Sequence, residues 1–297
     1  MSAAPGRSQA SSHRNAKHGG YPVGALPFFI EQGQGDTAVF LLHGVGGGHG
    51  AWDGSLPLLA EAGYRAIAWD APGYGQSVGQ SVGHSVGPSP SGEPCSMAMF
   101  AEALLKLIAH VGARRNVVLG HSMGGMIAQE ACLLDPAAID GLILFATSGA
   151  FGKPGGGWQR EFLQSRFAAL DAGLGMAGLA PVMVGGMLAL GASAQVRAEA
   201  ITLMSAVPEA TYRAALAAIV SFNRLDNLPN IKVPALCLAC AEDKTAPPSV
   251  MEKMAEKIPG GEYHCLGSAG HLGNLEQPEA FNAEVLRFLV QHFPIQE

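Results

Sequence analysis

Short apolar runs alternate with longer helical stretches along most of the chain. The runs are rich in aliphatic residues and have the length of buried strands. They cover residues 38–42, 64–69, 117–119, 142–145, 235–238 and 263–266. Strands separated by helical stretches in this way predict a mostly parallel sheet with crossover helices on both faces.

Two further elements lie at the ends of this pattern. Residues 28–31 precede a glycine-rich turn and predict an edge strand. Near the C-terminus, Pro278 suits the first turn of a helix, and apolar residues follow it at helical spacing. These apolar positions are Phe281, Val285, Phe288 and Leu289. We expect this helix to pack on the sheet and close the domain.

Two stretches interrupt the alternation. Residues 76–96 repeat Ser-Val-Gly at Ser77, Ser81 and Ser85 and then become rich in Pro and Ser. Such a composition buries too little apolar surface to order itself, so a mobile loop is expected. Residues 152–227 are helix-prone, poor in charge and too long for a simple crossover, so they predict a helical cap inserted between two strands.

The expected domain organisation has three parts. A core of sheet and helices spans residues 23–151 and 228–297, and the cap spans residues 152–227. Residues 1–22 are rich in Ser, Ala and Gly and are expected to be a disordered extension. This extension has basic residues and no acid, as transit peptides do, but no amphipathic pattern follows and it lacks the apolar segment of a signal peptide. We therefore expect a cytoplasmic protein.

Composition and charge narrow the functional classes. Of the 297 residues, 48% are hydrophobic and 14% are charged, which suits a sheet covered on both faces. The formal net charge is −6 without a basic stripe, so nucleic acid is not an expected partner. No run reaches the roughly 18 to 20 apolar residues of a membrane span. A small-molecule substrate is the expected partner, and no feature indicates an oligomeric state.

The five cysteines are expected to be reduced thiols. Cys237 and Cys240 form a Cys-x-x-Cys motif, but their spacing places them on opposite faces of a strand. They are poorly placed there to share a metal ion or a disulfide. We therefore interpret the motif as two buried small side chains and expect no metal site.

A serine motif follows the third apolar run. Gly120-His121-Ser122-Met123-Gly124 lies between the strand 117–119 and a helical pattern at 126–134. Strand, Gly-x-Ser-x-Gly and helix in this order are typical of a nucleophile elbow, a tight turn that lifts a serine hydroxyl above the sheet edge. Small residues at both glycine positions let strand and helix approach. Ser122 is the candidate nucleophile.

A serine hydroxyl at neutral pH needs a base to take its proton and an acid to orient that base. Asp243 lies just past the strand 235–238, and His271 lies in the loop after the strand 263–266. Both sit at the carboxyl ends of strands, where ligands gather in open α/β sheets. The predicted catalytic residues are Ser122, Asp243 and His271.

Other acids and histidines are weaker candidates for these roles. They are Glu242, Asp135 and Asp140 among the acids and His43, His49, His121 and His264 among the histidines. Asp135 and Asp140 precede the strand that follows them and so lie at its wrong end. His264 falls within a strand, His121 is held next to the nucleophile, and His43 is expected to be buried and structural.

The negative oxygen of a tetrahedral intermediate also needs hydrogen-bond donors. The segment 43–48, His-Gly-Val-Gly-Gly-Gly, follows the first core strand and can supply one backbone amide. We expect the amides of Val45 and Met123 to form this oxyanion hole, the latter helped by the N-terminus of its helix. No Gly-Lys-Ser/Thr follows the glycines, which argues against a phosphate-binding loop.

Together these segments resemble the α/β-hydrolase superfamily over about residues 25–293. The resemblance rests on the loop 43–48, the run 70–77 (Asp-Ala-Pro-Gly-Tyr-Gly-Gln-Ser), the elbow, Asp243 and His271. It implies an α/β-hydrolase fold, with a mostly parallel central sheet flanked by helices and a helical cap insertion. It also implies that Asp70 anchors a loop and is not a second catalytic acid.

Within the superfamily, the last third of the chain is most similar to 3-oxoadipate enol-lactonases. The similar segments are residues 207–212, 242–248 and 270–278. The resemblance implies that water opens a lactone ring without a cofactor. The chain departs from these enzymes in its oxyanion loop, where they carry an Asn-Ser-Leu-Gly type of sequence, and in the inserted residues 76–96.

The leading hypothesis is a cofactor-free serine hydrolase that cleaves a small carboxylic ester or lactone. Its pocket would lie under the cap, with Phe151 and Trp158 as candidate substrate-binding residues. A carbon-carbon bond hydrolase or a cofactor-free haloperoxidase would use the same three residues on the same fold. A non-enzymatic small-molecule receptor is the remaining alternative and would show at most slow single turnover.

Overall fold

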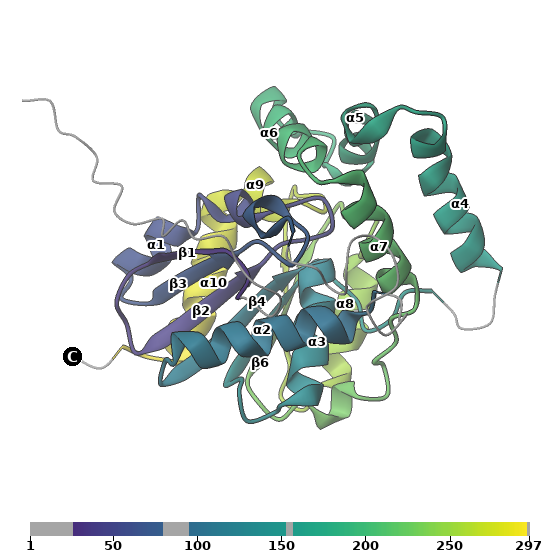
Figure 1. Ribbon diagram of the computed structural model, residues 1–297. Helices are drawn as coiled ribbons and strands as arrows, with labels where there is room; N and C mark the ends of the chain where they lie inside the picture. The colour runs from purple at the N-terminus through teal and green to yellow at the C-terminus, as the bar shows by residue number, and fades with distance from the viewer. Residues whose placement is uncertain (1–25, 80–94, 153–156, 296–297) are drawn as a thin grey trace, which may run out of the picture.

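The computed structural model, which describes residues 26–79, 95–152 and 157–295, is built on one seven-stranded sheet (Figure 1). The strand order is β1-β3-β2-β4-β5-β6-β7, with β1 antiparallel to β3 and the other neighbouring pairs parallel. The strands are β1 (Phe29–Gln32), β2 (Thr37–Leu42), β3 (Arg65–Trp69), β4 (Arg115–His121), β5 (Gly141–Phe145), β6 (Ala235–Cys240) and β7 (Glu262–Leu266). The predicted mostly parallel sheet is confirmed.

The strands agree with the apolar runs, and several extend beyond them. β2 and β6 are buried along their whole length, as expected for runs covered on both faces. β4 begins at Arg115 and ends at His121, outside the apolar residues 117–119. Its ladder with β2 pairs Thr37 with Arg115 and Leu42 with Gly120. Backbone pairing, and not apolar content alone, therefore sets where β4 begins and ends.

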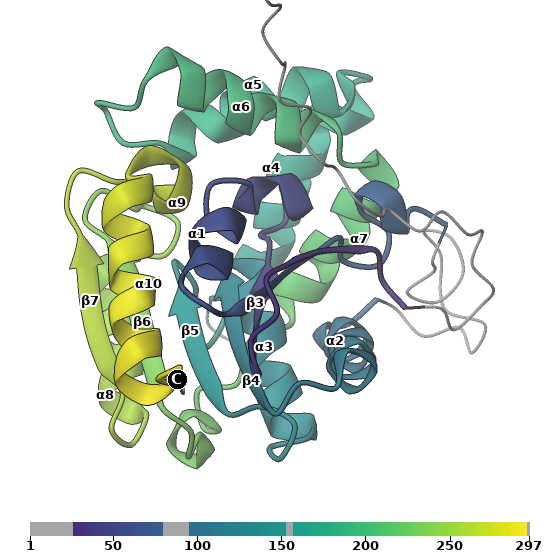
Figure 2. The same cartoon turned by 90° about the vertical axis from the view of Figure 1, so that its left-hand side faces the viewer.

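Helices cover both faces of the sheet. In chain order they are α1 (Leu56–Glu61), α2 (Met97–Val111), α3 (Met123–Leu134), α4 (Trp158–Asp171), α5 (Gly175–Met187), α6 (Ala194–Ser205), α7 (Glu209–Val220), α8 (Pro248–Lys257), α9 (Gly273–Glu276) and α10 (Pro278–His292). The helices α2, α3 and α8 pack on one face, and α1 and α10 pack on the other (Figure 2). The helix predicted to begin at Pro278 is present and closes the second face.

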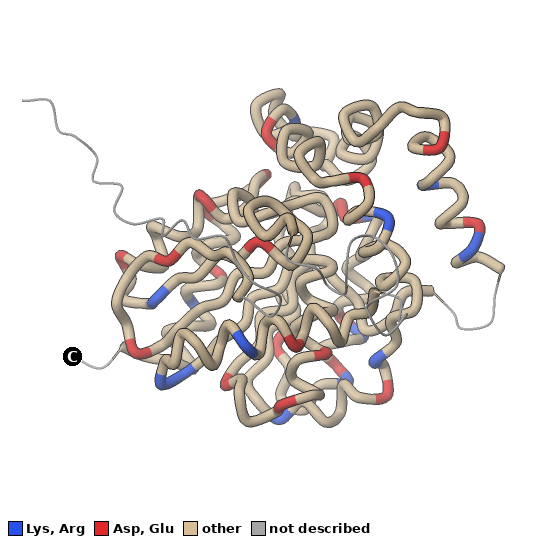
Figure 3. The backbone as a smooth tube through the Cα atoms, viewed as in Figure 1, with Lys and Arg blue, Asp and Glu red and all other residues tan. Residues whose placement is uncertain are grey.

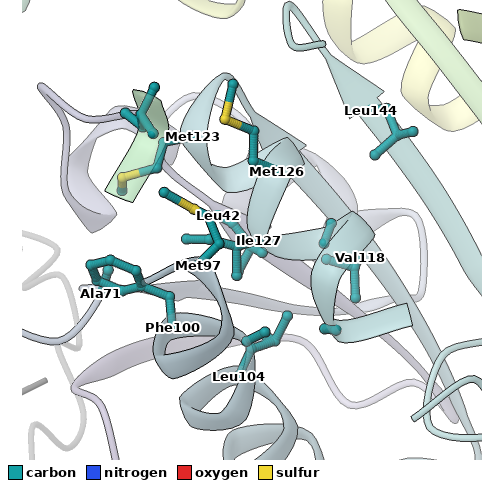
Figure 4. Packing of buried hydrophobic residues seen from close by; sticks show 14 of the residues in the cluster. Leu42, Ala71, Met97, Phe100, Leu104, Val118, Met123, Met126, Ile127 and Leu144 are labelled. Atoms are coloured by element: carbon teal, nitrogen blue, oxygen red, sulfur yellow. The ribbon is translucent and has the colours of Figure 1, made fainter. Parts of the chain in front are cut away.

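Side chains along each strand alternate between these two layers. Phe40 and Leu42 of β2 belong to the layer of α2 and α3, whereas Val39 and Leu41 belong to the layer of α1 and α10. Figure 4 shows the first layer, where side chains of α2 and α3 meet next to Leu42. Burying each such side chain stabilises the fold by roughly 1.5–3 kcal/mol. Met123, the first residue of α3, belongs to this layer, so the start of α3 is packed against the sheet.

The two cysteines of the Cys-x-x-Cys motif lie in different layers. Cys237 packs with α8 and its neighbours, and Cys240 packs in the layer of α10. Both are free thiols, as predicted. Burial raises the pKa of the Cys237 thiol to about 12, so it stays protonated at neutral pH.

Four helices, α4 to α7, lie between β5 and β6, within the stretch predicted to form a cap. The predicted cap covered residues 152–227, and from here on the word cap refers to its helices, residues 158–220. Figures 1 and 2 show α5 and α6 over the end of the sheet at which α9 also lies. The chain enters and leaves the cap beside this end, where Ala150 bridges to Asn223.

Two expectations fall on residues for which no structure is described. The extension at residues 1–22 and positions 80–94 of the expected loop 76–96 lie outside the described residues. Over the described ranges, Lys and Arg are interspersed with Asp and Glu (Figure 3). None of the helices in that part of the chain is long and apolar enough to cross a membrane.

Candidate active site

β4 passes into α3 through Ser122, whose backbone has φ 52° and ψ −112°. A non-glycine residue at such a positive φ is strained, by an energy of order 1–3 kcal/mol. Hydrogen bonds hold this backbone in place, among them one from the Met126 amide to the Ser122 carbonyl (3.3 Å). The Ser122 amide donates to the carbonyl of Phe145 (2.9 Å), and its carbonyl accepts from the Gly125 amide (3.0 Å) and the Thr147 hydroxyl (2.7 Å). The turn thereby holds the Ser122 side chain at the carboxyl edge of the sheet.

The glycines on either side of Ser122 leave room for this turn. A Cβ atom at Gly120 would overlap the carbonyl of Gly124, and one at Gly124 would overlap the carbonyl of Leu42. Both obstacles are backbone atoms, which cannot swing aside as a flexible side chain can. The close approach of β2, β4 and α3 therefore requires glycine at both positions.

The structure brings the three predicted catalytic residues together. Nε2 of His271 lies 3.0 Å from Oγ of Ser122, and Nδ1 of His271 lies 2.8 Å from Oδ2 of Asp243. These residues follow β4, β7 and β6, whose carboxyl ends meet at one edge of the parallel sheet. The result is a continuous hydrogen-bonded chain from hydroxyl to imidazole to carboxylate.

The carboxylate of Asp243 is held from both sides. Its Oδ1 accepts the amides of Thr245 (2.7 Å) and Ala246 (3.0 Å), while Oδ2 faces His271. Burial by itself raises the pKa of Asp243, but the hydrogen bond and charge of His271 and the two amides together lower that pKa below its ordinary value. Asp243 is therefore ionised at neutral pH and accepts a hydrogen bond from Nδ1–H of His271.

The alternative acids are engaged elsewhere. Oε2 of Glu242 accepts the amide of Leu190 (3.1 Å). Asp140 precedes β5 at the far end of the sheet, where its Oδ2 accepts the amide of Asn116 (2.7 Å). Asp135 accepts the amide of Ala137, two residues further on (3.2 Å).

Two buried histidines near Ser122 serve as neutral parts of the scaffold. Nε2 of His43 accepts the amide of Ala71 (3.0 Å), and its Nδ1 donates to the carbonyl of Gly44 (2.8 Å). Nε2 of His121 donates to the carbonyl of His271 (2.8 Å). Burial and the proximity of His271 lower the pKa of His121 to about 3. His264 lies in β7, as predicted.

Asp70 connects two loops and makes its hydrogen bonds to residues other than Ser122 and His271. Its Oδ1 accepts both the amide (2.8 Å) and Nδ1 (2.9 Å) of His49, and its Oδ2 accepts the amide of Gln76 (2.8 Å). The loop after β3 is thereby joined to the loop after β2, which is the anchoring position that the resemblance implies. Across the described ranges, no three His, Cys, Asp or Glu side chains gather as metal ligands.

The two residues expected at the oxyanion hole lie next to Ser122. Val45 belongs to the glycine loop after β2, and the pairing of Leu42 with Gly120 sets that loop beside the elbow. Met123 is the first residue of α3, so its amide has no acceptor within the helix. Val45 and Met123 both line the same cavity as Ser122.

A cavity of about 320 Å³ lies between Ser122 and the cap. Most of its lining is apolar and comes from α3, α4, α5 and α7. The candidate substrate-binding residues Phe151 and Trp158 both belong to the lining, with ring centroids 5.2 Å apart. Trp158 is 49% exposed, which places it at the rim.

A second, smaller cavity of about 40 Å³ meets the first at Ser122. It lies between the glycine loop and α6, and its walls include Gly46, Ala200 and Met204. Ser122 and His271 line both cavities. The hydroxyl of Ser122 therefore stands where a large and a small compartment join.

Sequence reasoning missed the polar lining of the cap and the residue that fastens the His271 loop. Arg166 and Tyr212 line the larger cavity from α4 and α7. Glu276 accepts the amides of Gly270 (3.0 Å) and Leu272 (3.3 Å) through Oε1 and the amide of Ala189 (2.7 Å) through Oε2. Helical periodicity does not reveal such contacts, because it does not specify which face of a cap helix meets the core.

Comparison with known proteins agrees with this geometry. The sequence profile of the Alpha/beta hydrolase family matches residues 39–284. A Mycobacterium tuberculosis protein whose name carries the term non-heme bromoperoxidase (BpoC) is 28% identical over 276 residues, which are 88% of this chain and 96% of the relative.

Solved structures show the same architecture. A thermophilic esterase from Thermogutta terrifontis superposes with a TM-score of 0.77 at 26% identity, over 89% of this chain and 93% of that one. The enol-lactonase from Burkholderia xenovorans LB400 superposes with a TM-score of 0.75 at 22% identity, over 89% and 96% of the two chains. At that identity the second likeness concerns the fold alone.

Proposed function

Because the chain belongs to the alpha/beta hydrolase family, we propose that it is a cofactor-free serine hydrolase that cleaves a small carboxylic ester or lactone. The observation that carries the proposal is the hydrogen-bonded chain from Ser122 through His271 to Asp243, with distances of 3.0 and 2.8 Å. Ser122 and His271 line a cavity that is large enough for a small organic substrate. The likeness to the Thermogutta esterase supports the ester-cleaving class.

Acylation begins at Oγ of Ser122. Nε2 of His271 accepts the hydroxyl proton as Oγ attacks the substrate carbonyl carbon, and ionised Asp243 stabilises the imidazolium that forms. The carbonyl oxygen becomes negative and accepts hydrogen bonds from the amides of Val45 and Met123. His271 then gives the proton to the leaving alkoxide, and the acyl group stays on Ser122.

Deacylation repeats these steps with water as the nucleophile. His271 takes a proton from the water, the hydroxide attacks the acyl carbon, and the proton returns to Oγ of Ser122 as the acid leaves. With a lactone, the alkoxide remains part of the acyl group, so the product is a single hydroxy acid. The chain's own side chains supply nucleophile, base and orienting acid, so the proposed reaction uses no cofactor.

We infer that the substrate lies in the cavity under the cap. Phe151 and Trp158 belong to the lining of this cavity, which supports their proposed role in substrate binding. In the same proposal, the smaller cavity beside the glycine loop takes the group on the other side of the scissile carbonyl. The expected cytoplasmic location stays a prediction of the sequence.

Steady-state hydrolysis by the wild type and Ser122→Ala tests the proposal. The substrates are 4-nitrophenyl acetate and butyrate, γ-butyrolactone and 3-oxoadipate enol-lactone, with circular dichroism as the control for folding. The wild type should complete many turnovers on at least one substrate, and Ser122→Ala should lower kcat by about 10³-fold or more. Equal activity of the two proteins would contradict the proposal.

Product stoichiometry and further substrates separate the alternative functions. Product stoichiometry that stops at one per chain would favour a small-molecule receptor over an enzyme. Turnover of a vinylogous 1,5-diketone, or peroxide-dependent halogenation, in the absence of any ester or lactone hydrolysis would favour a carbon-carbon bond hydrolase or a haloperoxidase.

A further inference from the structure

The smaller cavity beside Ser122 is bounded on one side by α6. Ala200, Leu203 and Met204 line it, and their spacing of three and four residues places them on one face of that helix. The glycine loop lies opposite, and Gly46 is part of the lining there. Because a glycine has no side chain, the side chains of α6 limit the depth of this cavity.

Met204 contacts the glycine loop directly. A Cβ atom at Gly46 would overlap Cε of Met204, so the methyl end of this side chain occupies the place that a side chain at Gly46 would take. Met204 is buried and belongs to the apolar cluster that includes most of the cap, and such close packing restricts its rotation. The Met204 side chain therefore bounds the smaller cavity over Gly46.

The volume of the smaller cavity limits the size of its occupant. It measures about 40 Å³, and a site for one water takes roughly 10–15 Å³ of such space, so about three non-hydrogen atoms fit. The larger cavity measures about 320 Å³, which lies within the range of pockets for drug-sized ligands. Cavities of such unequal size join at Ser122, so they favour a substrate whose scissile carbonyl carries one short and one long substituent.

The lining of the smaller cavity favours an apolar occupant. Among its polar side chains, His121 donates to the carbonyl of His271, and Asn274 donates to the carbonyl of Ala51, both at 2.8 Å. Ser122 and His271 belong to the proposed reaction. No Asp, Glu, Lys or Arg is among the lining residues that the structure describes. A charged group would lose its hydration there without gaining a partner.

We propose that the substrate is an ester with one short side, an apolar group of about three non-hydrogen atoms or fewer next to the scissile carbonyl, and that Met204 is the specificity-determining residue that sets this limit. This inference rests on the proposed function and deepens it by naming the class of ester. The short group is either the acyl chain or the alcohol, and its longer counterpart lies in the larger cavity. A longer group in the smaller cavity would overlap Met204, and such overpacking is unfavourable.

Two series of esters measure the limit and identify the short side. In the first, 4-nitrophenyl acetate, propionate, butyrate and hexanoate vary the acyl chain. In the second, methyl, ethyl, butyl and hexyl phenylacetate vary the alcohol, and the release of acid is followed. We expect kcat/KM of the wild type to fall at least about tenfold in one series, either between butyrate and hexanoate or between the ethyl and butyl esters. The other series should show no such fall.

Met204→Ala removes three non-hydrogen atoms from the lining and should move the fall to longer chains in the same series. The ratio of kcat/KM for the hexanoate or butyl ester to that for the shorter ester should rise at least about tenfold. Met176→Ala is the matched control, because Met176 is a buried methionine of α5 outside the lining of both cavities. It should keep the wild-type ratio.

Combining Gly46→Ala with Met204→Ala tests the limit from the opposite side of the cavity. The backbone of Gly46 does not have a positive φ, so alanine suits it. The new Cβ atom would lie 3.5 Å from Cβ of Met204, an ordinary contact once the rest of that side chain is removed. The double variant should therefore recover part of the wild-type discrimination against long chains.

Each ratio compares two esters within one protein, so it does not depend on the fraction of the enzyme that is folded. A wild type without a fall in either series, or with the same fall in both, overturns the inference and leaves the proposed function intact. A Met204→Ala ratio equal to that of the wild type, or a Met176→Ala ratio that rises as far, also overturns it. A wild type that hydrolyses lactones but none of these esters overturns the inference alone, whereas one that hydrolyses neither contradicts the proposed function as well.

Discussion

The amide of His271 donates a 2.7 Å hydrogen bond to the carbonyl of Met187, the last residue of α5. The histidine that contacts Ser122 is therefore joined directly to the cap. The neighbouring Gly270 leaves no space for a side chain, because a Cβ atom there would overlap the same carbonyl. The position of α5 in the cap and the position of His271 are thus coupled through backbone contacts.

Glu276 strengthens this coupling, because its carboxylate accepts amides from both the His271 loop and the segment after α5. Glu276→Gln replaces one carboxylate oxygen with an NH2 group, so the amide contacts made to that oxygen are lost while the other oxygen still accepts. We expect kcat to fall roughly tenfold, since losing a charge-assisted hydrogen bond changes the position of His271. Glu279→Gln, at an exposed acid on α10, is the control and should retain wild-type kcat. A Glu276→Gln variant with unchanged kcat would show that the loop holds His271 without it.

Asp243→Asn removes the charge that orients His271 while keeping the size of the side chain. We expect kcat on any ester substrate to fall by about 10³ to 10⁴, because the wrong imidazole tautomer faces Ser122. Glu242→Gln should change kcat by less than about tenfold, since Glu242 binds only the amide of Leu190 among the described contacts. Comparable losses in the two variants would mean that the acid has been misassigned.

The Asp70–His49 pair predicts a window of pH in which it stabilises the fold. Hydrogen bonds from His49 and the amide of Gln76 offset burial and lower the pKa of Asp70 below its ordinary 3.8, so its contribution is present above that pH and is lost as the pH falls through the lowered pKa. The hydrogen bond to Asp70 raises the pKa of His49 above 6.5, so the contribution of His49 is present below 6.5 and is lost as the pH rises through the raised pKa.

Thermal denaturation of wild type and Asp70→Asn from pH 3 to pH 9 measures this window. The difference in stability should reach about 3 kcal/mol between pH 4 and pH 6.5 and narrow on both sides. Asp36→Asn, at an exposed aspartate, should show no such maximum. A difference for Asp70→Asn that stays constant over the whole range would exclude the pair as its source.

Gly124→Ala tests the steric demand of the elbow. The added methyl group would overlap the carbonyl of Leu42, so we expect a loss of roughly 3 kcal/mol in unfolding free energy together with loss of activity. Gly185→Ala in α5 is the matched control, because its Cβ would meet only Nη1 of Arg197 at 3.6 Å and helix propensity favours alanine by up to about 1 kcal/mol. Urea unfolding compares the two, and wild-type stability in Gly124→Ala would refute the steric account.

Sequence reasoning was sufficient for the sheet and for the meeting of three distant residues. Apolar runs identify strands, and parallel strands must end at a common edge, so residues placed just after strand ends become neighbours. Ser122, Asp243 and His271 were named from this rule together with the Gly-x-Ser-x-Gly motif and the need of a serine nucleophile for a base and an acid. The ends of β4 did not follow from it, because its polar first residues are strand only through their ladder with β2.

The cap was harder to predict in detail. Leu170 is the one buried residue of α4, so hydrophobic periodicity does not single out the face of that helix that meets the cavity. Phe151 and Trp158 were named as apolar candidates for the pocket and line the cavity, whereas Arg166 and Tyr212 were not named. Only the packing of the cap helices on the core shows which of their side chains line the cavity.

Covalent labelling with a fluorophosphonate tests the central claim most directly, because the reagent reports an activated serine without requiring knowledge of the substrate. The intact wild-type protein is incubated with the reagent, digested and mapped by mass spectrometry, with His271→Ala in parallel. We expect one adduct, on Oγ of Ser122, formed at least about 10³ times more slowly in His271→Ala. Absence of labelling, or an adduct on another residue of the wild type, would contradict the assignment of Ser122 as an activated nucleophile.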